Sequence, residues 1–401
     1  MKYLIVLGDG MADRPTKELE GKTPLQVAAK PNIDMLAKRG TVGLVRTVPN
    51  GCVAGSDVAN LSVLGYDPRV YYTGRAPLEA LSMGVNLEQG DLALRTNLVT
   101  LSTHESFSEK RMVDYSAGEI PTEESKKLMQ NIEKELGNEK FTFYPGVSYR
   151  HLLVVKQGSP STILTPPHDI SGQRIDDYLP EGEGAEEYID LIVESGKILE
   201  NHPINVKREE EGKRPATHLW FWGGGTKPEL PAFSEKYGLN GAVVSAVDLM
   251  KGIAKGTGMS APKVRGATGT LETNWNGKIS AAIDEFESGK DFVYIHLEAP
   301  DECSHQGDIR GKVEAIERVD YVVGKLYSYL KNTKEAFRIA VLPDHATPLN
   351  IMTHSNEPVP YLIYKSDLEL EGCTEYNEED AQRGLYLDDA GIIMRMLISE
   401  L

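Results

Sequence analysis

The chain has 401 residues, of which 40% are hydrophobic and 26% are charged. This length exceeds what one compact core usually holds, so we expect one large domain and a smaller second one. The net charge of −17 argues against nucleic acid and anionic membranes as partners, because both are bound by positively charged surfaces.

The lack of a recognisable targeting segment and the pattern of the cysteines both predict a cytoplasmic protein. The apolar run at residues 3–7 is too short for the core of a signal peptide, and no run elsewhere approaches a membrane span. Cys52, Cys303 and Cys373 are scattered and show no CxxC spacing, which is typical of a reducing compartment. Nothing in the sequence indicates the oligomeric state.

Strand-like and helix-like segments alternate along much of the chain. Helix periodicity predicts helices at 31–40, where Gly40 would cap the C-terminus, and at 313–330. Short apolar runs predict strands buried on both faces at 3–7, 217–222, 242–245, 292–297, 338–342 and 360–364. This alternation predicts an α/β fold with a mainly parallel sheet flanked by helices.

Residues 76–189 have a different pattern. One clear helix is predicted at 122–136, with strands at 94–101 and 151–155. The acidic, glycine-rich stretch 180–187 is typical of a solvated linker. We therefore expect a small α+β domain at 76–189, inserted into a larger domain formed by 1–75 and 190–401. A loop-rich extension of a single domain is the alternative.

Aspartate and histidine residues follow three predicted strands. Because parallel strands end at the same edge of a sheet, such residues can meet there. Each set alone has a simpler explanation as a turn, a helix cap or an exposed histidine, but together they have the types and number that two divalent metal sites require. The sets are Asp9; Asp301 and His305, which are four residues apart and share one helical face; and Asp344 and His345 with His354.

The expected ligands also favour particular metals and reactions. Imidazole and carboxylate groups suit Mn²⁺ first, with Co²⁺, Zn²⁺ or Mg²⁺ as alternatives. Two such ions clamp a transferring phosphoryl group, which predicts phosphate or sulfate ester chemistry. Cys303, which lies between Asp301 and His305, is a minor alternative ligand.

Ser56 is the candidate nucleophile. It follows Gly55 and would open a helix, where N–H groups and the helix dipole favour a phosphate. Coordination to a metal would activate its hydroxyl without a histidine base. The alternative is that Ser56 only caps the helix.

Two long segments, 54–68 and 72–80, closely resemble the archaeal-type 2,3-bisphosphoglycerate-independent phosphoglycerate mutases of the alkaline phosphatase superfamily. The resemblance extends to 8–15, 233–239, 266–269 and 344–348. It implies interconversion of 3-phosphoglycerate and 2-phosphoglycerate through a phosphoserine, without 2,3-bisphosphoglycerate. It also implies one metal on Asp9, Ser56, Asp344 and His345, and a second on Asp301, His305 and His354.

The resemblance further implies that the inserted domain is a lid that excludes water and binds a small anionic phosphate ester. Guanidinium and ammonium groups suit its carboxylate and phosphate. The substrate-binding candidates are Arg75, Arg150, Lys236, Arg265, His168 and Asp169, and further lid candidates are Arg95, Arg111, Arg174, His104 and His151.

The segment 299–307 departs from the archaeal pattern, because Cys303 and Ser304 replace small residues there. Three other functions remain open. A phosphatase, phosphodiesterase or sulfatase would use water as the acceptor. A homoserine kinase would use ATP, although the chain lacks a Walker-type motif. A non-catalytic metal-binding protein would not need Ser56.

Overall fold

The computed structural model describes residues 1–104 and 106–399. Its contacts divide the chain into two compact units. Unit 1 comprises Met1–Tyr72 and Glu229–Leu401, and unit 2 comprises Thr73–Pro228. An insertion near residue 76 was predicted, but its predicted end at 189 falls inside a helix of unit 2, so the second boundary lies about forty residues later.

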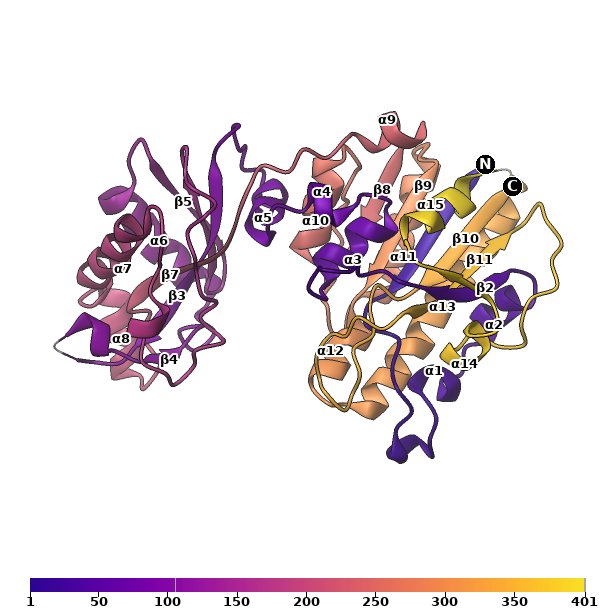
Figure 1. Cartoon of the computed structure of the whole chain (residues 1–401), viewed down its shortest axis with the longest axis horizontal. Coiled ribbons are helices and arrows are strands. Elements are labelled where there is room, and N and C mark those ends of the chain that lie inside the picture. Colours follow the sequence, from indigo (N-terminus) through magenta and orange to yellow (C-terminus); the bar gives the residue numbers. More distant parts are fainter. Residues whose placement is uncertain (105, 400–401) are drawn as a thin grey trace. The chain divides into compact units, whose positions relative to one another are not determined.

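Unit 1 is built on a seven-stranded sheet (Figure 1). Four of its six strand pairs are parallel, and β11 pairs antiparallel with both of its neighbours. The order across the sheet is β12 (Leu385–Leu387), β2 (Thr41–Val45), β11 (Val359–Lys365), β10 (Phe337–Leu342), β1 (Lys2–Gly8), β9 (Phe292–Leu297) and β8 (Gly241–Val244). The predicted α/β fold with a mainly parallel sheet is therefore confirmed, and the antiparallel strand β11 makes the sheet mixed.

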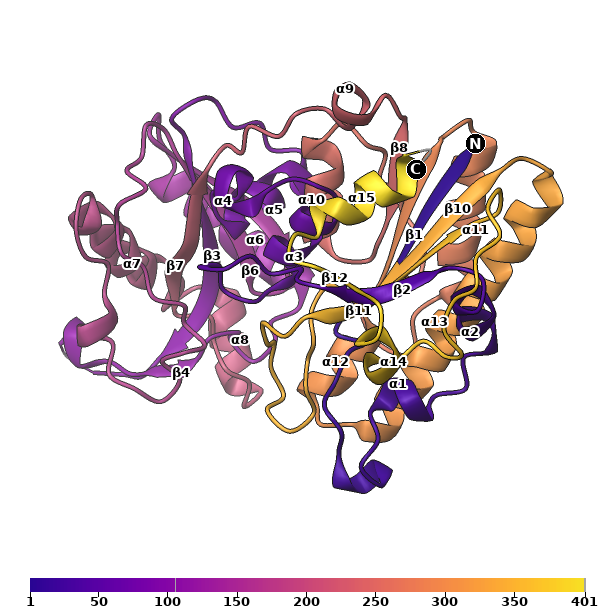
Figure 2. The same cartoon turned by 45° about the vertical axis from the view of Figure 1, so that its right-hand side comes forward.

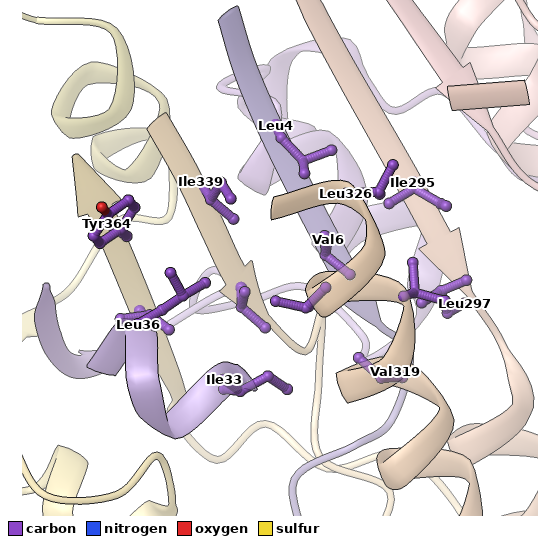
Figure 3. Close-up of a cluster of buried hydrophobic side chains, with 14 of the residues drawn as sticks. Leu4, Val6, Ile33, Leu36, Ile295, Leu297, Val319, Leu326, Ile339 and Tyr364 are labelled. Carbon is purple, nitrogen blue, oxygen red and sulfur yellow. The ribbon is translucent and has the colours of Figure 1, made fainter. Parts of the chain in front are cut away.

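Apolar side chains from alternate strand positions form the core on one face of this sheet, as a period of two requires. Figure 3 shows Leu4 and Val6 of β1 beside Ile295 of β9, facing the helices α13 (Ile309–Thr333) and α2 (Pro31–Ala37). Val319 and Leu326 of α13 are fully buried in this cluster. Helix α11 (Trp275–Glu287) covers the same face nearer to β8 and β9.

The other face of the sheet carries α3 (Ser56–Val63), α10 (Asp248–Gly256) and α15 (Gly391–Ile398), as Figure 2 shows. Shorter helical segments connect these layers. They are η1 (Lys17–Leu19), α1 (Pro24–Val27), α4 (Pro68–Tyr71), α9 (Phe233–Tyr237), α12 (Ala299–His305) and α14 (Glu378–Ala381).

The predicted C-terminal cap of α2 is wrong. The helix ends at Ala37 with Lys38 as the cap, and Gly40 lies just before β2. A Cβ on Gly40 would lie 2.6 Å from the carbonyl oxygen of Ile363. Glycine is therefore needed there for close backbone approach to β11.

Unit 2 contains an antiparallel sheet. The long strand β3 (Leu92–Leu101) lies at its centre and pairs with three others. They are β4 (Met112–Asp114), β6 (Arg150–Val155) and β7 (His218–Thr226), and β6 also pairs with β5 (Phe141–Val147). The run at 217–222 is thus a strand, but it belongs to this sheet rather than to the parallel one.

Helices cover the sheet of unit 2. The predicted helix α6 (Thr122–Leu136) packs against β5, and α7 (Ala185–Leu199) packs against β7. The remaining elements are α5 (Arg75–Met83), η2 (Phe107–Glu109), η3 (Asp176–Tyr178) and α8 (Pro203–Glu210). The stretch 180–187 leads into α7 and is not a linker between units. No helix within the described residues combines the length and apolarity of a membrane span.

Candidate active site

The predicted strand-end residues of unit 1 come together at one edge of the sheet. Strands β10, β1 and β9 are parallel neighbours, so their C-terminal ends open onto the same space. Asp9 follows β1, Asp301 lies in α12 just after β9, and Asp344 with His345 follows β10. Three overlapping sets of carboxylate and imidazole atoms, each within 4.8 Å, occur among the described residues.

The first set comprises Asp301, His305 and His354. Asp301 and His305 lie on one turn of α12, as their spacing predicted. The His305 Nε2 lies 3.1 Å from Asp301 Oδ2, and the His354 Nε2 lies 3.5 Å from Asp301 Oδ1. The two Nε2 atoms are 3.0 Å apart. Three ligand atoms thus converge on one point.

The neighbours of His305 determine which of its nitrogens carries the lone pair. Its Nδ1 lies 2.9 Å from the carbonyl oxygen of Met352, which only accepts hydrogen bonds. Nδ1 therefore donates, and in the neutral ring Nε2 is left bare. A carbonyl that orients an imidazole in this way is the usual support of a metal-binding histidine.

The second group contains Ser56, Asp9, Asp344 and His345. The Ser56 Oγ lies 3.1 Å from His345 Nε2 and 3.5 Å from Asp9 Oδ2. The His345 Nε2 in turn lies 3.5 Å from Asp9 Oδ1 and from Asp344 Oδ2. The four residues predicted to share one ion are therefore close together around the Ser56 hydroxyl.

Ser56 is the first residue of α3, with Gly55 as the N-cap. Gly55 has an extended backbone and no side-chain cap, so the serine itself is not the capping residue. Within α3, the Asn60 Nδ2 donates to the backbone carbonyl of Ser56 at 2.7 Å and to Asp344 Oδ2 at 2.8 Å. This amide fixes the first turn of the helix against the loop after β10.

Thr347 connects the two groups. Its hydroxyl donates to Asp301 Oδ1 at 2.6 Å, so its single hydrogen is already used. The Nδ1 of His345, 3.1 Å from the same hydroxyl oxygen, must therefore be the donor in that contact. Neutral His345 then presents a bare Nε2 toward Ser56 and Asp9.

Burial and charge perturb these groups strongly. Burial and repulsion from Asp344 and Asp301 raise the pKa of Asp9 well above its ordinary value. Burial also acts to raise the pKa of Asp301, but hydrogen bonds from His305, when its Nε2 carries a hydrogen, and from His354 outweigh burial and hold that pKa well below the usual range. Divalent cations beside these three buried carboxylates would relieve their mutual repulsion.

The donor set fits divalent metal ions. Oδ1 of Asp9 is buried and has no hydrogen-bond partner among the described residues. Such an orphaned oxygen, 3.5 Å from the bare Nε2 of neutral His345, has the chemistry of a metal ligand. Cys303 is buried, burial raises its thiol pKa to about 11, and it belongs to none of the three ligand sets found among the described residues.

Sequence reasoning missed His296. This residue lies on β9, is 1% exposed, and places its Nε2 3.2 Å from Asp9 Oδ2. It forms one of the three metal-capable sets with Asp9 and Asp344. The available signal was a lone histidine inside the apolar run 292–297, one residue before the strand ends.

The structure brings several predicted lid residues together in unit 2. Arg75 and Arg95 both pair with Glu79, at 3.5 Å and 3.1 Å. The guanidinium of Arg95 lies 4.0 Å from the ring centre of Trp222, and the ring of His168 lies 5.1 Å from the same indole.

The other lid candidates in unit 2 differ in burial and in the side chains that they contact. Arg150 lies 5.0 Å from the ring centre of Tyr149, whose ring contacts Tyr115. Asp169 is exposed beside His168, with a carboxylate oxygen 3.4 Å from Nε2. His151 is buried, and the side chain of Arg174 is paired with Asp176.

The last two substrate-binding candidates, Lys236 and Arg265, lie in unit 1. Lys236 is exposed on α9, with its Nζ 5.2 Å from the ring centre of Tyr66 and 5.5 Å from that of Tyr237. Arg265 is also exposed, and its backbone carbonyl accepts a hydrogen bond from Asn274. Both residues therefore have the solvent access that a substrate-binding cation needs.

Comparison with known proteins gives consistent matches. The family model of 2,3-bisphosphoglycerate-independent phosphoglycerate mutase matches residues 37–205, and the model of type I phosphodiesterase / nucleotide pyrophosphatase matches residues 178–357. The chain is 49% identical to the 2,3-bisphosphoglycerate-independent phosphoglycerate mutase of Methanosarcina barkeri, covering 96% of each chain. It is also 49% identical to a probable enzyme of that name from Geobacter sulfurreducens, covering 99% of this chain and 100% of the relative.

Two solved structures share the fold of this chain over nearly its whole length. A protein from Pyrococcus horikoshii has a TM-score of 0.83 at 31% identity, covering 99% of this chain and 96% of the other. The cofactor-independent phosphoglycerate mutase of Thermoplasma acidophilum has a TM-score of 0.66 at 27% identity, covering 99% of both chains.

These matches assign the chain to the alkaline phosphatase superfamily, and its mostly parallel sheet with acidic and imidazole side chains at the strand ends agrees with that class. Within that superfamily, the chain belongs to the archaeal-type 2,3-bisphosphoglycerate-independent phosphoglycerate mutases, which are isomerases.

Proposed function

We propose that this protein interconverts 3-phosphoglycerate and 2-phosphoglycerate by moving the phosphoryl group through Ser56, without 2,3-bisphosphoglycerate. The observation that carries the proposal is the position of the Ser56 hydroxyl at the start of α3, 3.1 Å from His345 and 3.5 Å from Asp9. The family match supplies the substrate.

Two divalent ions would be held by the clustered side chains. Asp9, Ser56, Asp344 and His345 would hold the first ion, which we call the Asp9 ion, and Asp301, His305 and His354 would hold the second, which we call the His305 ion. Bound ions would supply Lewis acidity that lowers the pKa of the serine hydroxyl and neutralises charge on the phosphoryl oxygens. The mixed imidazole and carboxylate donors favour Mn²⁺ first, with Co²⁺, Zn²⁺ or Mg²⁺ as alternatives.

The protein groups would position the reactants. The amide of Asn60 holds the first turn of α3 against Asp344, which fixes the Ser56 hydroxyl relative to the ligand cluster. The helix N-terminus favours the negative phosphoryl group that Ser56 receives. Ser56 would attack phosphorus, the alkoxide of glycerate would leave, and the other hydroxyl of the same glycerate would later take the phosphoryl group back.

Retention of glycerate is the requirement that separates a mutase from a phosphatase, since water would otherwise hydrolyse the phosphoserine. We propose that unit 2 acts as the lid. Its grouped side chains, Arg75, Arg95, Arg150 and His168, have the charge and planar geometry to bind the carboxylate of glycerate. Lys236 and Arg265 of unit 1, and Asp169 of unit 2, remain candidates for substrate contacts.

A hydrolase is the second candidate, because the type I phosphodiesterase model matches residues 178–357. Purified protein with Mn²⁺ and 3-phosphoglycerate, in the absence of 2,3-bisphosphoglycerate, separates the two. A mutase produces 2-phosphoglycerate with little free phosphate. Phosphate release without 2-phosphoglycerate would move the assignment to a hydrolase, and ATP consumption that requires homoserine would move it to a kinase.

A further inference from the structure

A chain of buried charged side chains leads away from Asp9 and has no part in the chemistry described above. It runs from His296 on β9 to Glu298, directly after that strand, and then to Lys278 on α11. His296 is 1%, Glu298 4% and Lys278 0% exposed. All three lie in unit 1, so the arrangement is internal to one compact body.

Each link of this chain is a specific contact. The Nζ of Lys278 donates to Glu298 Oε2 in a short hydrogen bond. Glu298 Oε1 accepts from the His296 ring at 3.2 Å, from the hydroxyl of Ser245 at 2.9 Å and from the backbone N–H of Ala246 at 3.0 Å. Both carboxylate oxygens are therefore occupied, and the carboxylate has one orientation.

The fixed carboxylate in turn fixes the His296 ring. Because Nδ1 is held by Glu298, the opposite nitrogen points the other way, and it makes an ion-pair contact of 3.2 Å with Asp9 Oδ2 that lies outside hydrogen-bond geometry. Asp9 Oδ1 and His296 Nε2 are both buried without a hydrogen-bond partner in the described part of the chain. The ring thus lies against Asp9 Oδ2, and Asp9 Oδ1 is left for another ligand.

Fold stability alone does not account for this arrangement. Replacing a buried ion pair with well-packed apolar residues is often neutral or stabilising, so a buried lysine and glutamate behind the site need a further reason. Side chains that orient a metal ligand from behind supply one, since their loss typically lowers metal affinity 10- to 100-fold.

We propose that Lys278, Glu298 and His296 form a positioning relay that orients Asp9 for the Asp9 ion. The relay acts through Asp9 and touches no reacting atom, so its members are positioning residues. It does not serve the His305 ion, whose ligands are oriented instead by the Met352 carbonyl and by Thr347. The proposal rests on the proposed function only in taking Asp9 as a metal ligand.

The test measures Mn²⁺ affinity, by calorimetry or by the electron paramagnetic resonance of free Mn²⁺, rather than turnover. The main variant is Lys278→Met/Glu298→Gln, which removes both charges together and leaves no buried charge unpaired. The Asp9 ion is measured in a His354→Ala background and the His305 ion in an Asp344→Ala background. We expect the double change to lower the affinity for the Asp9 ion 10- to 100-fold and the affinity for the His305 ion less than threefold.

Two further variants separate a relay from a general loosening of the fold. His296→Phe should lower the affinity for the Asp9 ion by a similar factor. Adding Lys278→Met/Glu298→Gln to this variant should lower that affinity less than threefold further, because the pair acts through His296. The matched control is Glu124→Gln, which breaks the pair with the 3% exposed Arg208 in unit 2. It should leave both affinities unchanged.

Several outcomes would overturn the relay. The first is an unchanged affinity for the Asp9 ion in the double variant. The second is an equal fall in affinity for both ions, and the third is a fully additive loss of affinity in the triple variant. If the wild-type protein binds Mn²⁺ at Asp9 but shows no mutase activity, the proposed reaction fails and the relay stands. If the double variant keeps both mutase activity and affinity for the Asp9 ion, the relay alone fails. No Mn²⁺ binding by the wild type would refute both.

Discussion

His305 and His354 point their Nε2 atoms at each other across 3.0 Å, beside the carboxylate of Asp301. At this separation a hydrogen or a cation must lie between the two nitrogens, because two unprotonated ring nitrogens would repel each other. The His305 ion proposed above would occupy this position, with Nε2 of His305 available as a ligand because its Nδ1 donates to Met352.

Removing Asp301 or His354 should therefore remove one metal ion and leave the other. We expect Asp301→Ala and His354→Ala each to retain about one equivalent of Mn²⁺ per chain after dialysis, against two for the wild type, as measured by elemental analysis. His104→Ala, which changes an exposed histidine of unit 2, is the control and should keep both. Two equivalents in both site variants would show that the His305 ion has been assigned wrongly.

Ser56→Ala should abolish turnover but keep the metals. The hydroxyl is the proposed phosphoryl acceptor, so we expect kcat to fall by at least about 1,000-fold, while most of the bound Mn²⁺ remains. Ser62→Ala is a matched control on the same helix, because its hydroxyl donates only to the carbonyl of Val58. Mass spectrometry of quenched wild-type reactions should detect a phosphate on Ser56. Loss of both metals in Ser56→Ala would instead make the serine a structural ligand.

Lys312 and Asp13 form a fully buried pair behind the loop that carries His345. The Nζ of Lys312 lies 2.7 Å from Asp13 Oδ2 and 2.9 Å from the carbonyl of Thr347. Lys312→Met leaves Asp13 buried without its cation, so we expect a loss of about 3–5 kcal/mol in the free energy of unfolding in urea. The double variant Lys312→Met/Asp13→Asn should recover part of that loss, and equal stability of the two variants would contradict this account.

Metal binding should stabilise the protein, because the ions neutralise the carboxylates of Asp9, Asp301 and Asp344. At a free Mn²⁺ concentration 100 times the dissociation constant of a site, we expect each bound ion to raise the free energy of unfolding by about 2.7 kcal/mol. Urea titrations with Mn²⁺ and with a chelator measure the difference. No dependence on Mn²⁺ would indicate that the clustered carboxylates are neutralised by protons alone.

His151 should make unit 2 sensitive to acid. Burial lowers its pKa from 6.5 to about 3, so the folded state holds the ring neutral while the unfolded state binds a proton. Its contribution to stability is therefore complete above pH 6.5 and is lost progressively as pH falls toward 3, with a slope of up to about 1.4 kcal/mol per pH unit.

His151→Asn removes this titration and keeps an acceptor for the N–H of Gly146, which bonds the His151 Nδ1 at 3.0 Å. We expect a smaller loss of stability between pH 6.5 and 4.5 in the variant than in the wild type. Tryptophan fluorescence is a suitable probe, since Trp220 and Trp222 both lie on β7 of unit 2. Identical slopes in the two proteins would contradict the prediction.

Features with a strong local pattern were predictable from the sequence. The apolar run 292–297 and the helix 122–136 match β9 and α6 residue for residue, and the four-residue spacing of Asp301 and His305 places both on α12. The family resemblance is confirmed, and it named ligands that the structure brings within a few ångströms of each other.

Non-local features were not predictable. The run 217–222 has the composition of a buried strand, but its composition does not say which sheet it joins, so the end of the insertion was placed too early. His296 was missed because a histidine within an apolar strand has no periodic signature, and its meaning depends on Asp9 in the neighbouring strand. The cytoplasmic location remains a prediction.

The two ends of unit 2 nearly meet within that unit. The hydroxyl of Thr73 lies 2.5 Å from the carbonyl of Thr226, and a Cβ on Gly74 would lie 2.2 Å from the carbonyl of Gly224. An insertion closed in this way can be exchanged or shortened in evolution without moving the strands that hold Asp9, Asp301 and Asp344. The proposed lid can therefore diversify while the proposed phosphate-binding residues stay constant.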